Sequence, residues 1–230
     1  MVHYAGASYS SPDKIKSWSC DPHCKALPDF APKTVISDQH QDLQGFIGYD
    51  NDSQTIIISF RGTVETSIQN WITDLSIAQT SPWPNFPTVK VHKGFYQAYL
   101  ALKPQILAEI SIMPEVALQI TGHSLGAGLA SICAFDLLVE ENYRISSLYN
   151  FGSPRVGNYD WSIAFRKKIP NNWRITHAKD IVVHAPPQSS GFYHLIVEVW
   201  YKNSDYDGVY HICNGSGNSL SNIIHLIFYI

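Results

Sequence analysis

An α/β fold with a largely parallel sheet is the fold class that this sequence predicts, from two observations. Apolar, strand-like runs alternate along the chain with helix-like stretches, an order typical of a parallel sheet flanked by helices. Turn-forming residues follow directly after several of the strand-like runs. The 230 residues suffice for one core, so we expect a single domain over residues 1–230.

The expected elements follow one another in a regular order. The expected strands share an apolar, β-prone composition and lie at 55–60, 116–121, 147–151 and 173–177. A helix is expected at 94–114, where apolar residues keep helical spacing and Pro104 predicts a kink, and another at 129–139. Ligands of such sheets bind at the carboxyl ends of the strands. We therefore expect one shared edge for four residues that follow strands: Thr63, Ser124, Pro154 and Asp180.

Composition excludes several classes of partner. Charged residues make up 15% of the chain, the net charge is -3 and like charges form no runs, so we expect no nucleic-acid partner and no polybasic membrane anchor. No apolar run reaches the roughly 18 residues of a transmembrane helix. The first residues lack the pattern of a secretory signal, so we expect either an intracellular protein or a secreted one whose signal is missing.

The cysteines favour the secreted alternative. Cys20 and Cys24 flank a short loop that contains a proline, and we expect a disulfide between them. Such a pair could also be half of a metal site, but no second pair accompanies it, so we expect no metal. Cys133 falls in a helix-like run and is expected to be a buried thiol, while Cys213 has no obvious partner. Two N-glycosylation sequences, also typical of secreted proteins, begin at Asn51 and Asn214.

The segment Gly122-His123-Ser124-Leu125-Gly126 is typical of a nucleophile elbow, because it lies between a strand-like and a helix-like run. In such an elbow a sharp turn exposes the serine hydroxyl, and glycines remove side chains that would clash in the turn. Ser124 is therefore the candidate nucleophile. The backbone N–H of Leu125 is expected to point into the same pocket and to stabilise the oxyanion of an ester reaction.

A serine nucleophile needs a base, and the base needs a carboxylate that orients it. Asp180 is the downstream acid that directly follows an expected strand. Spacing alone does not choose the base among His184, His194, His211 and His225.

Motifs in a fixed order along the chain resemble those of one family. They are Phe60-Arg61-Gly62-Thr63, the Ser-Ile-Gln-Asn-Trp-Ile-Thr-Asp-Leu stretch at 67–75, Val91-His92-Lys93-Gly94-Phe95, the elbow, Gly152-Ser153-Pro154-Arg155, Arg174-Ile175-Thr176-His177 and His225-Leu226. With these motifs the chain resembles the class 3 lipases, close to the filamentous-fungal triacylglycerol lipases, from about Trp18 onward.

The resemblance implies an α/β-hydrolase fold and assigns roles to residues. It implies a triad of Ser124, Asp180 and His225, in the chain order usual for this fold. It makes Thr63 the second oxyanion donor, with Asp74 holding the Thr63 hydroxyl. His194 matches a family position outside the triad, and we expect it, with His92 and His123, to be structural.

The resemblance also implies a short helical lid at about 65–72. Ile68, Trp71 and Ile72 could form its apolar face and bind acyl chains, so that the pocket opens at a lipid–water interface.

The expected function is that of a secreted carboxylic-ester hydrolase without a cofactor, a triacylglycerol lipase that forms a covalent acyl-enzyme. Two alternatives stay open. One is a feruloyl or acetyl esterase acting on plant polysaccharide, which shares the fold and the triad. The other is a catalytically inactive relative that binds lipid or glycan.

Overall fold

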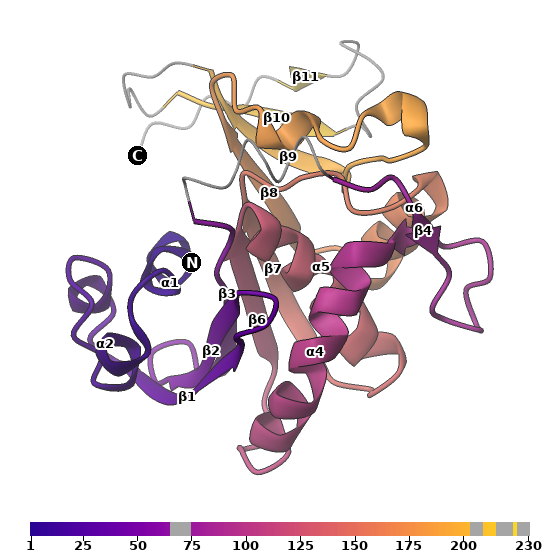
Figure 1. Cartoon of the computed structure of the whole chain (residues 1–230). Coiled ribbons are helices and arrows are strands. Elements are labelled where there is room, and N and C mark those ends of the chain that lie inside the picture. Colours follow the sequence, from indigo (N-terminus) through magenta and orange to yellow (C-terminus); the bar gives the residue numbers. More distant parts are fainter. Residues whose placement is uncertain (65–74, 203–208, 215–222, 225–230) are drawn as a thin grey trace.

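The computed structural model describes residues 1–64, 75–202, 209–214 and 223–224. Within this part, nine strands form one sheet (Figure 1). In spatial order they are β1 (Phe30–Asp38), β2 (Leu43–Asp50), β3 (Thr55–Phe60), β6 (Leu118–His123), β7 (Ile145–Phe151), β8 (Asn172–His177), β9 (Val197–Tyr201), β10 (His211–Asn214) and β11 (Ile223–Ile224). A separate two-stranded ribbon pairs β4 (Gln79–Thr80) with β5 (Val91–His92).

The centre of the large sheet is parallel, as the sequence predicts. Strands β3, β6, β7, β8 and β9 run parallel to one another, whereas β1 and β2 on one side and β10 and β11 on the other pair antiparallel. The register places Phe60, Gly122, Asn150 and Arg174 in one row across the four central strands. The segments that follow these strands therefore leave the sheet at one edge.

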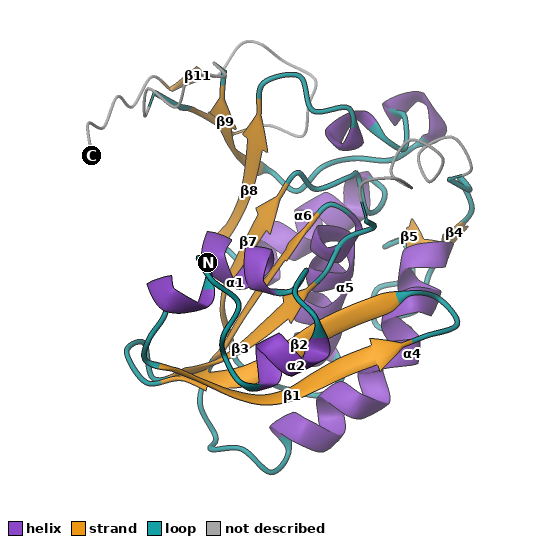
Figure 2. Cartoon of the chain, turned by 60° about the vertical axis from the view of Figure 1, so that its left-hand side comes forward, coloured by secondary structure: helices purple, strands orange, loops and turns teal. Residues whose placement is uncertain are grey.

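Helices cover both faces of the sheet (Figure 2). On one face lie α4 (Lys93–Ile110), α5 (Leu125–Val139) and α6 (Tyr159–Lys168), and on the other α1 (Val2–Ala7) and α2 (Pro12–Lys16). Single 3-10 turns are formed by η1 (Cys24–Ala26), η3 (Val182–His184) and η4 (Gln188–Ser190). Among the described residues, no helix is both long and apolar enough to cross a bilayer.

The two faces have separate hydrophobic cores, and β3 shows how one strand serves both. Ile56, Ile58 and Phe60 belong to the larger core under α4, α5 and α6. Ile57 points the other way and packs with Tyr4 in the smaller core under α1 and α2. This two-residue alternation is the pleat of a strand, and it explains why the run at 55–60 is apolar throughout.

The cysteines lie as the sequence predicts. Cys20 and Cys24 are joined by a disulfide and are buried in the smaller core. Cys133 is a free thiol in the buried middle of α5, and Cys213, on β10, is free and partly exposed.

Pro104 lies inside α4, which continues past it to Ile110. His92 caps the start of this helix, because its Nδ1 accepts a hydrogen bond of 3.1 Å from Phe95 N. This contact agrees with the structural role expected for His92.

Candidate active site

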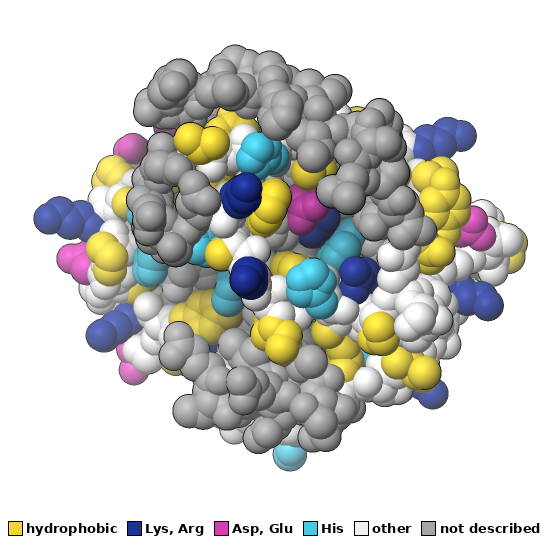
Figure 3. Space-filling view, turned by 90° about the horizontal axis from the view of Figure 1, so that it is seen from above, with side chains coloured by type: hydrophobic (Ala, Val, Ile, Leu, Met, Phe, Trp, Pro, Cys, Tyr) yellow, Lys and Arg dark blue, Asp and Glu magenta, His cyan; other side chains and the backbone are white. Residues whose placement is uncertain are grey.

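Four segments meet at the edge where the central strands end. Gly62 and Thr63 follow β3, Ser124 follows β6, Gly152 follows β7 and Asp180 follows β8. Figure 3 looks onto this edge from above, where histidine and basic side chains lie among apolar ones, with an acidic side chain beside them. The shared edge expected from the sequence is therefore present in the structure.

Ser124 occupies a sharp turn between β6 and α5. Its backbone has φ 55° and ψ -126°, in the positive-φ region that residues with a side chain seldom adopt. Ser124 N donates to Phe151 O at 3.0 Å, and Ser124 O accepts from Ala127 N at 3.0 Å. The serine is thus held by the sheet on one side and by the first turn of α5 on the other, as in a nucleophile elbow.

The two elbow glycines are required by close backbone contacts. A Cβ atom at Gly122 would lie 2.3 Å from the carbonyl oxygen of Gly126. A Cβ atom at Gly126 would lie 2.3 Å from the carbonyl oxygen of Phe60, at the end of β3. Helix α5 therefore begins directly against the backbones of two strands, which only glycine permits at these positions.

The side-chain oxygens of Ser124 and Thr63 are buried without a hydrogen-bond partner among the described residues. An unsatisfied buried polar atom costs about 1–3 kcal/mol, so in a native protein it needs an explanation. One explanation is that these hydroxyls act in a reaction and form hydrogen bonds only when substrate is present. Leu125 is the first residue of α5 and directly follows Ser124. Its N–H has no hydrogen-bond acceptor within the helix, because the first N–H groups of a helix never do.

Asp180 lies two strands away from Ser124, because β7 separates β6 from β8. Two strand spacings are about 10 Å, a gap that an imidazole can bridge with a hydrogen bond at each end. Asp180 Oδ1 accepts a hydrogen bond of 2.9 Å from Val182 N, and Oδ2 faces Gly152. The carboxylate is therefore oriented by its own loop.

Arg155 and His194 hold the loop that follows Asp180. Arg155 Nη1 donates to His184 O at 2.6 Å and to Pro186 O at 3.0 Å. His194 Nε2 lies 2.8 Å from Val183 O and donates to it, since a carbonyl oxygen only accepts. Burial holds the pKa of His194 well below its ordinary value, so this ring stays neutral. The contact agrees with the structural role expected for His194.

Several sequence-predicted site residues lie outside the described part of the chain. They are the proposed base His225, the proposed Thr63 partner Asp74, and the lid at 65–72 with Ile68, Trp71 and Ile72. The described part places the expected nucleophile, both expected oxyanion donors and the expected acid at one edge. It also places Tyr9 there, through hydrogen bonds to Gly62 and His123 that nothing in the sequence near Tyr9 indicates.

A model of the family described as Lipase (class 3) matches residues 57–190, more than half of the chain. The chain belongs to the class 3 lipases. The matched region includes the elbow and Asp180. It excludes the first 56 residues of this class 3 lipase, and with them Tyr9.

Relatives and solved structures agree with this membership. The chain is 34% identical over 201 residues to a lipase of Rhizomucor miehei, a match that covers 84% of this chain and 54% of that protein. It is 31% identical over 219 residues to a secreted mono- and diacylglycerol lipase of Penicillium cyclopium, covering 86% of this chain and 68% of that one. This class 3 lipase chain thus spans about half the length of the Rhizomucor protein.

A solved triacylglycerol lipase, described as having a serine protease triad at its catalytic centre, superposes with a TM-score of 0.79. The two are 31% identical, and the match covers 94% of this chain and 83% of that one. The fold of this class 3 lipase is therefore the α/β-hydrolase fold that the motifs imply.

Proposed function

We propose that this class 3 lipase chain hydrolyses carboxylic esters of acylglycerols through a covalent acyl-enzyme on Ser124. The observation that carries the proposal is the elbow, which holds a buried serine hydroxyl beside the Leu125 N–H and the Thr63 segment. Membership of the family, and relatives that are described as lipases, support the choice of reaction.

In the first half of the reaction, Ser124 Oγ attacks the ester carbonyl carbon while the base takes the hydroxyl proton. The carbonyl oxygen becomes negatively charged, and we propose that the N–H groups of Leu125 and Thr63 donate hydrogen bonds to it. Such preorganised donors typically supply several kcal/mol of transition-state stabilisation. The intermediate then collapses, the base returns the proton to the leaving alcohol, and the acyl group stays on Ser124.

In the second half, a water molecule attacks the acyl carbon and the base takes its proton. The same donors stabilise the new oxyanion, and the carboxylic acid leaves as the proton returns to Ser124 Oγ. We propose His225 as this base and Asp180 as the carboxylate that stabilises its protonated form. The bond from Val182 N to Asp180 Oδ1 supports this role, because it fixes the carboxylate while Oδ2 faces the site.

We also propose that a lid at 65–72, with an apolar face formed by Ile68, Trp71 and Ile72, controls access to Ser124. The burial of Ser124 supports this, since an ester reaches a buried hydroxyl only after a covering segment moves. Lid control predicts that hydrolysis of a short-chain ester rises abruptly when its solubility limit is crossed. A rate that follows simple saturation through that limit would count against the lid.

The disulfide between Cys20 and Cys24 and the secreted Penicillium relative support a secreted protein. We therefore propose that this protein is secreted.

A substrate panel tests the proposal. Emulsified triacylglycerols, p-nitrophenyl esters and methyl ferulate are incubated with the protein and with Ser124→Ala as the matched control. We expect the protein to hydrolyse the triacylglycerols and the p-nitrophenyl esters, and Ser124→Ala to hydrolyse neither. Preference for methyl ferulate would point to the polysaccharide esterases, and no turnover of any ester would point to an inactive binding relative.

A further inference from the structure

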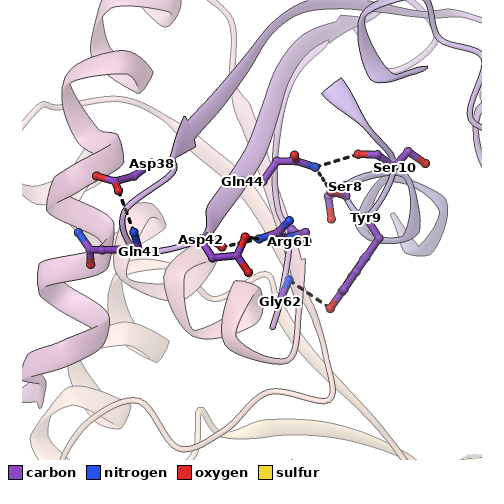
Figure 4. A network of polar contacts seen from close by, with 9 residues as sticks. All are labelled: Ser8, Tyr9, Ser10, Asp38, Gln41, Asp42, Gln44, Arg61 and Gly62. Carbon is purple, nitrogen blue, oxygen red and sulfur yellow. Dashed lines mark hydrogen bonds and ion pairs between the residues drawn. The ribbon is translucent and has the colours of Figure 1, made fainter. Parts of the chain in front are cut away.

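Tyr9 is held against the sheet by Gln44 of β2. The side-chain amide of Gln44 donates to the carbonyl oxygens on both sides of Tyr9, to Ser8 O at 2.8 Å and to Ser10 O at 2.9 Å (Figure 4). The backbone oxygen of Gln44 also accepts from Arg61 N at 2.8 Å. One strand residue therefore holds both the Tyr9 segment and the segment that follows β3.

The Tyr9 hydroxyl joins two parts of the candidate active site. Gly62 N donates to Tyr9 Oη over 3.1 Å, and Tyr9 Oη lies 2.6 Å from His123 Nδ1 (Figure 4 shows the bond to Gly62). A backbone N–H only donates, so the oxygen is the acceptor toward Gly62. If the hydroxyl hydrogen is donated to Nδ1, His123 is the neutral tautomer that carries its proton on Nε2. Burial lowers the pKa of His123 and favours this neutral form.

Gly62 is the point at which these groups touch. A Cβ atom at Gly62 would lie 2.4 Å from Tyr9 Oη, 2.5 Å from His123 O and 2.9 Å from Ser124 Cβ. The chain after β3 is therefore in contact with the tyrosine and with the elbow at once. The next residue is Thr63, the proposed oxyanion donor. A displacement of Gly62 would move the Thr63 N–H relative to Ser124.

We propose that Tyr9 is a positioning residue for ester hydrolysis, whose hydroxyl fixes the segment from Arg61 to Thr63 against the elbow so that the Thr63 and Leu125 N–H groups converge on one oxygen. This inference rests on the proposed function. It assigns a role in the reaction to a residue outside the region 57–190 that the family model matches.

The salt bridge of Arg61 secures the same segment from the other side. Arg61 Nη2 lies 2.6 Å from Asp42 Oδ1, and it also donates to the carbonyl oxygen of Asp42 (Figure 4). Asp42 therefore holds Arg61, and Tyr9 holds the next residue, Gly62. The transition state benefits from donors that are already in place, because no free energy is then lost in reorienting them during the reaction.

The test compares the wild-type protein with Tyr9→Phe, which removes the hydroxyl and keeps the ring. Active sites are counted by titration with a p-nitrophenyl alkylphosphonate, so that the rates refer to functional molecules only. We expect kcat for p-nitrophenyl butyrate to fall about tenfold, less than for loss of an oxyanion donor itself. The rate of phosphonylation should fall by the same factor, because the phosphonyl oxygen uses the same donors.

Two further readouts separate positioning from a merely structural role. The KM of Tyr9→Phe should stay within about twofold of the wild-type value, and the acidic limb of its pH–rate profile should keep its midpoint, since the base is unaltered. A kcat equal to that of the wild type, or a change confined to KM, would overturn the proposal.

Control variants complete the experiment. Tyr49→Phe removes a hydroxyl that donates to Gln54 Oε1 at a distant turn, and its kcat should match the wild type. A loss in Tyr49→Phe as large as in Tyr9→Phe would overturn the proposal. His123→Asn keeps an acceptor near the position of Nδ1 and should retain more kcat than His123→Leu. If the wild type neither turns over esters nor reacts with the phosphonate, the proposed function is wrong and this inference with it.

Discussion

Gly152 and the carboxylate of Asp180 are so close that a Cβ atom at Gly152 would lie 2.8 Å from Asp180 Oδ2. The same atom would lie 3.5 Å from His123 Nε2. Gly152 also has φ +56°, where a side chain is strained. The turn after β7 therefore leaves just enough space for the proposed triad acid.

We expect Gly152→Ala to lower activity as well as stability. The added methyl group would displace the Asp180 carboxylate from its position beside the proposed base, and kcat should fall about tenfold or more, as when a catalytic group is misplaced. The left-handed backbone should cost about 1–2 kcal/mol in the free energy of unfolding. Urea unfolding and kcat for a p-nitrophenyl ester measure the two effects.

Gly191→Ala is the matched control for this substitution. Gly191 also has a positive φ, of +81°, but the nearest atom to its added Cβ would be Gln79 Nε2 at 3.7 Å, an ordinary contact. Gly191→Ala should therefore lose stability and keep kcat. Equal kcat losses in the two variants would show that the contact with Asp180 is not the cause.

Removal of Arg174 should destabilise the sheet beneath the Asp180 loop. Arg174 Nη1 on β8 lies 2.8 Å from Glu198 Oε1 on β9, and the arginine side chain is only 4% exposed. Arg174→Met would leave the partly buried Glu198 carboxylate without its charge partner, although Thr176 Oγ1 still donates to it. We expect a cost of about 3 kcal/mol in the free energy of unfolding. Urea unfolding measures this cost.

The double variant Arg174→Met with Glu198→Gln should recover part of that stability, because it removes the stranded charge. A double variant that is less stable than Arg174→Met would contradict the explanation.

Stability should fall as the solution becomes acidic. Burial lowers the pKa of His92, His123 and His194 below the ordinary value of 6.5, although Asp180 partly opposes this for His123. Below about pH 6.5 the unfolded chain takes up protons that these folded rings do not, which favours unfolding. The free energy of unfolding should therefore be level between pH 7 and 8 and decrease below about 6.5.

His92→Asn tests the cause of that decrease. Asparagine can still accept from Phe95 N but does not titrate, so the stability of this variant should depend less steeply on pH. Urea midpoints measured from pH 8 to pH 5 make the comparison. An unchanged slope would mean that His92 does not contribute.

The proposed base can be tested against a neighbouring histidine. His225→Ala should lower kcat by several orders of magnitude, since without a base the serine proton has no acceptor. His194→Gln should keep most of the activity, because His194 contacts Val183 O and not the reacting atoms. The two variants are compared by kcat per mole of folded protein, because a variant without its base would not react with the phosphonate. The opposite ranking would overturn the choice of His225.

The central part of the fold was predictable from sequence because its signals are local. Three such signals depend only on residues that are close together in the sequence: the apolar run at 55–60, the elbow glycines and the strand before Asp180. The structure places all three as expected. The flanking strands β1 and β2 were not predicted. In β1 few residues are fully buried, and buried and exposed positions alternate irregularly. In β2 six of the eight residues are buried, but Gln44, Gly45 and Gly48 interrupt the apolar pattern in its sequence.

The candidate site was predictable where a residue follows a central strand, and not where it comes from elsewhere. Ser124 and Asp180 could be chosen because each follows a strand that the sequence predicts. Tyr9 could not, because its bond to His123 spans 114 positions in the sequence and depends on how the segment after α1 packs on the sheet. Sequence spacing also left the base open, and His225 rests on the family resemblance.

Covalent labelling tests whether Ser124 is the nucleophile of ester hydrolysis. The protein is treated with a p-nitrophenyl alkylphosphonate, and the modified residue is identified by peptide mass spectrometry while residual ester hydrolysis is followed. We expect one phosphonyl group per chain, on Ser124, with activity lost in proportion to labelling. A fully labelled protein that still hydrolyses esters, or a label found on another residue as activity disappears, would contradict it.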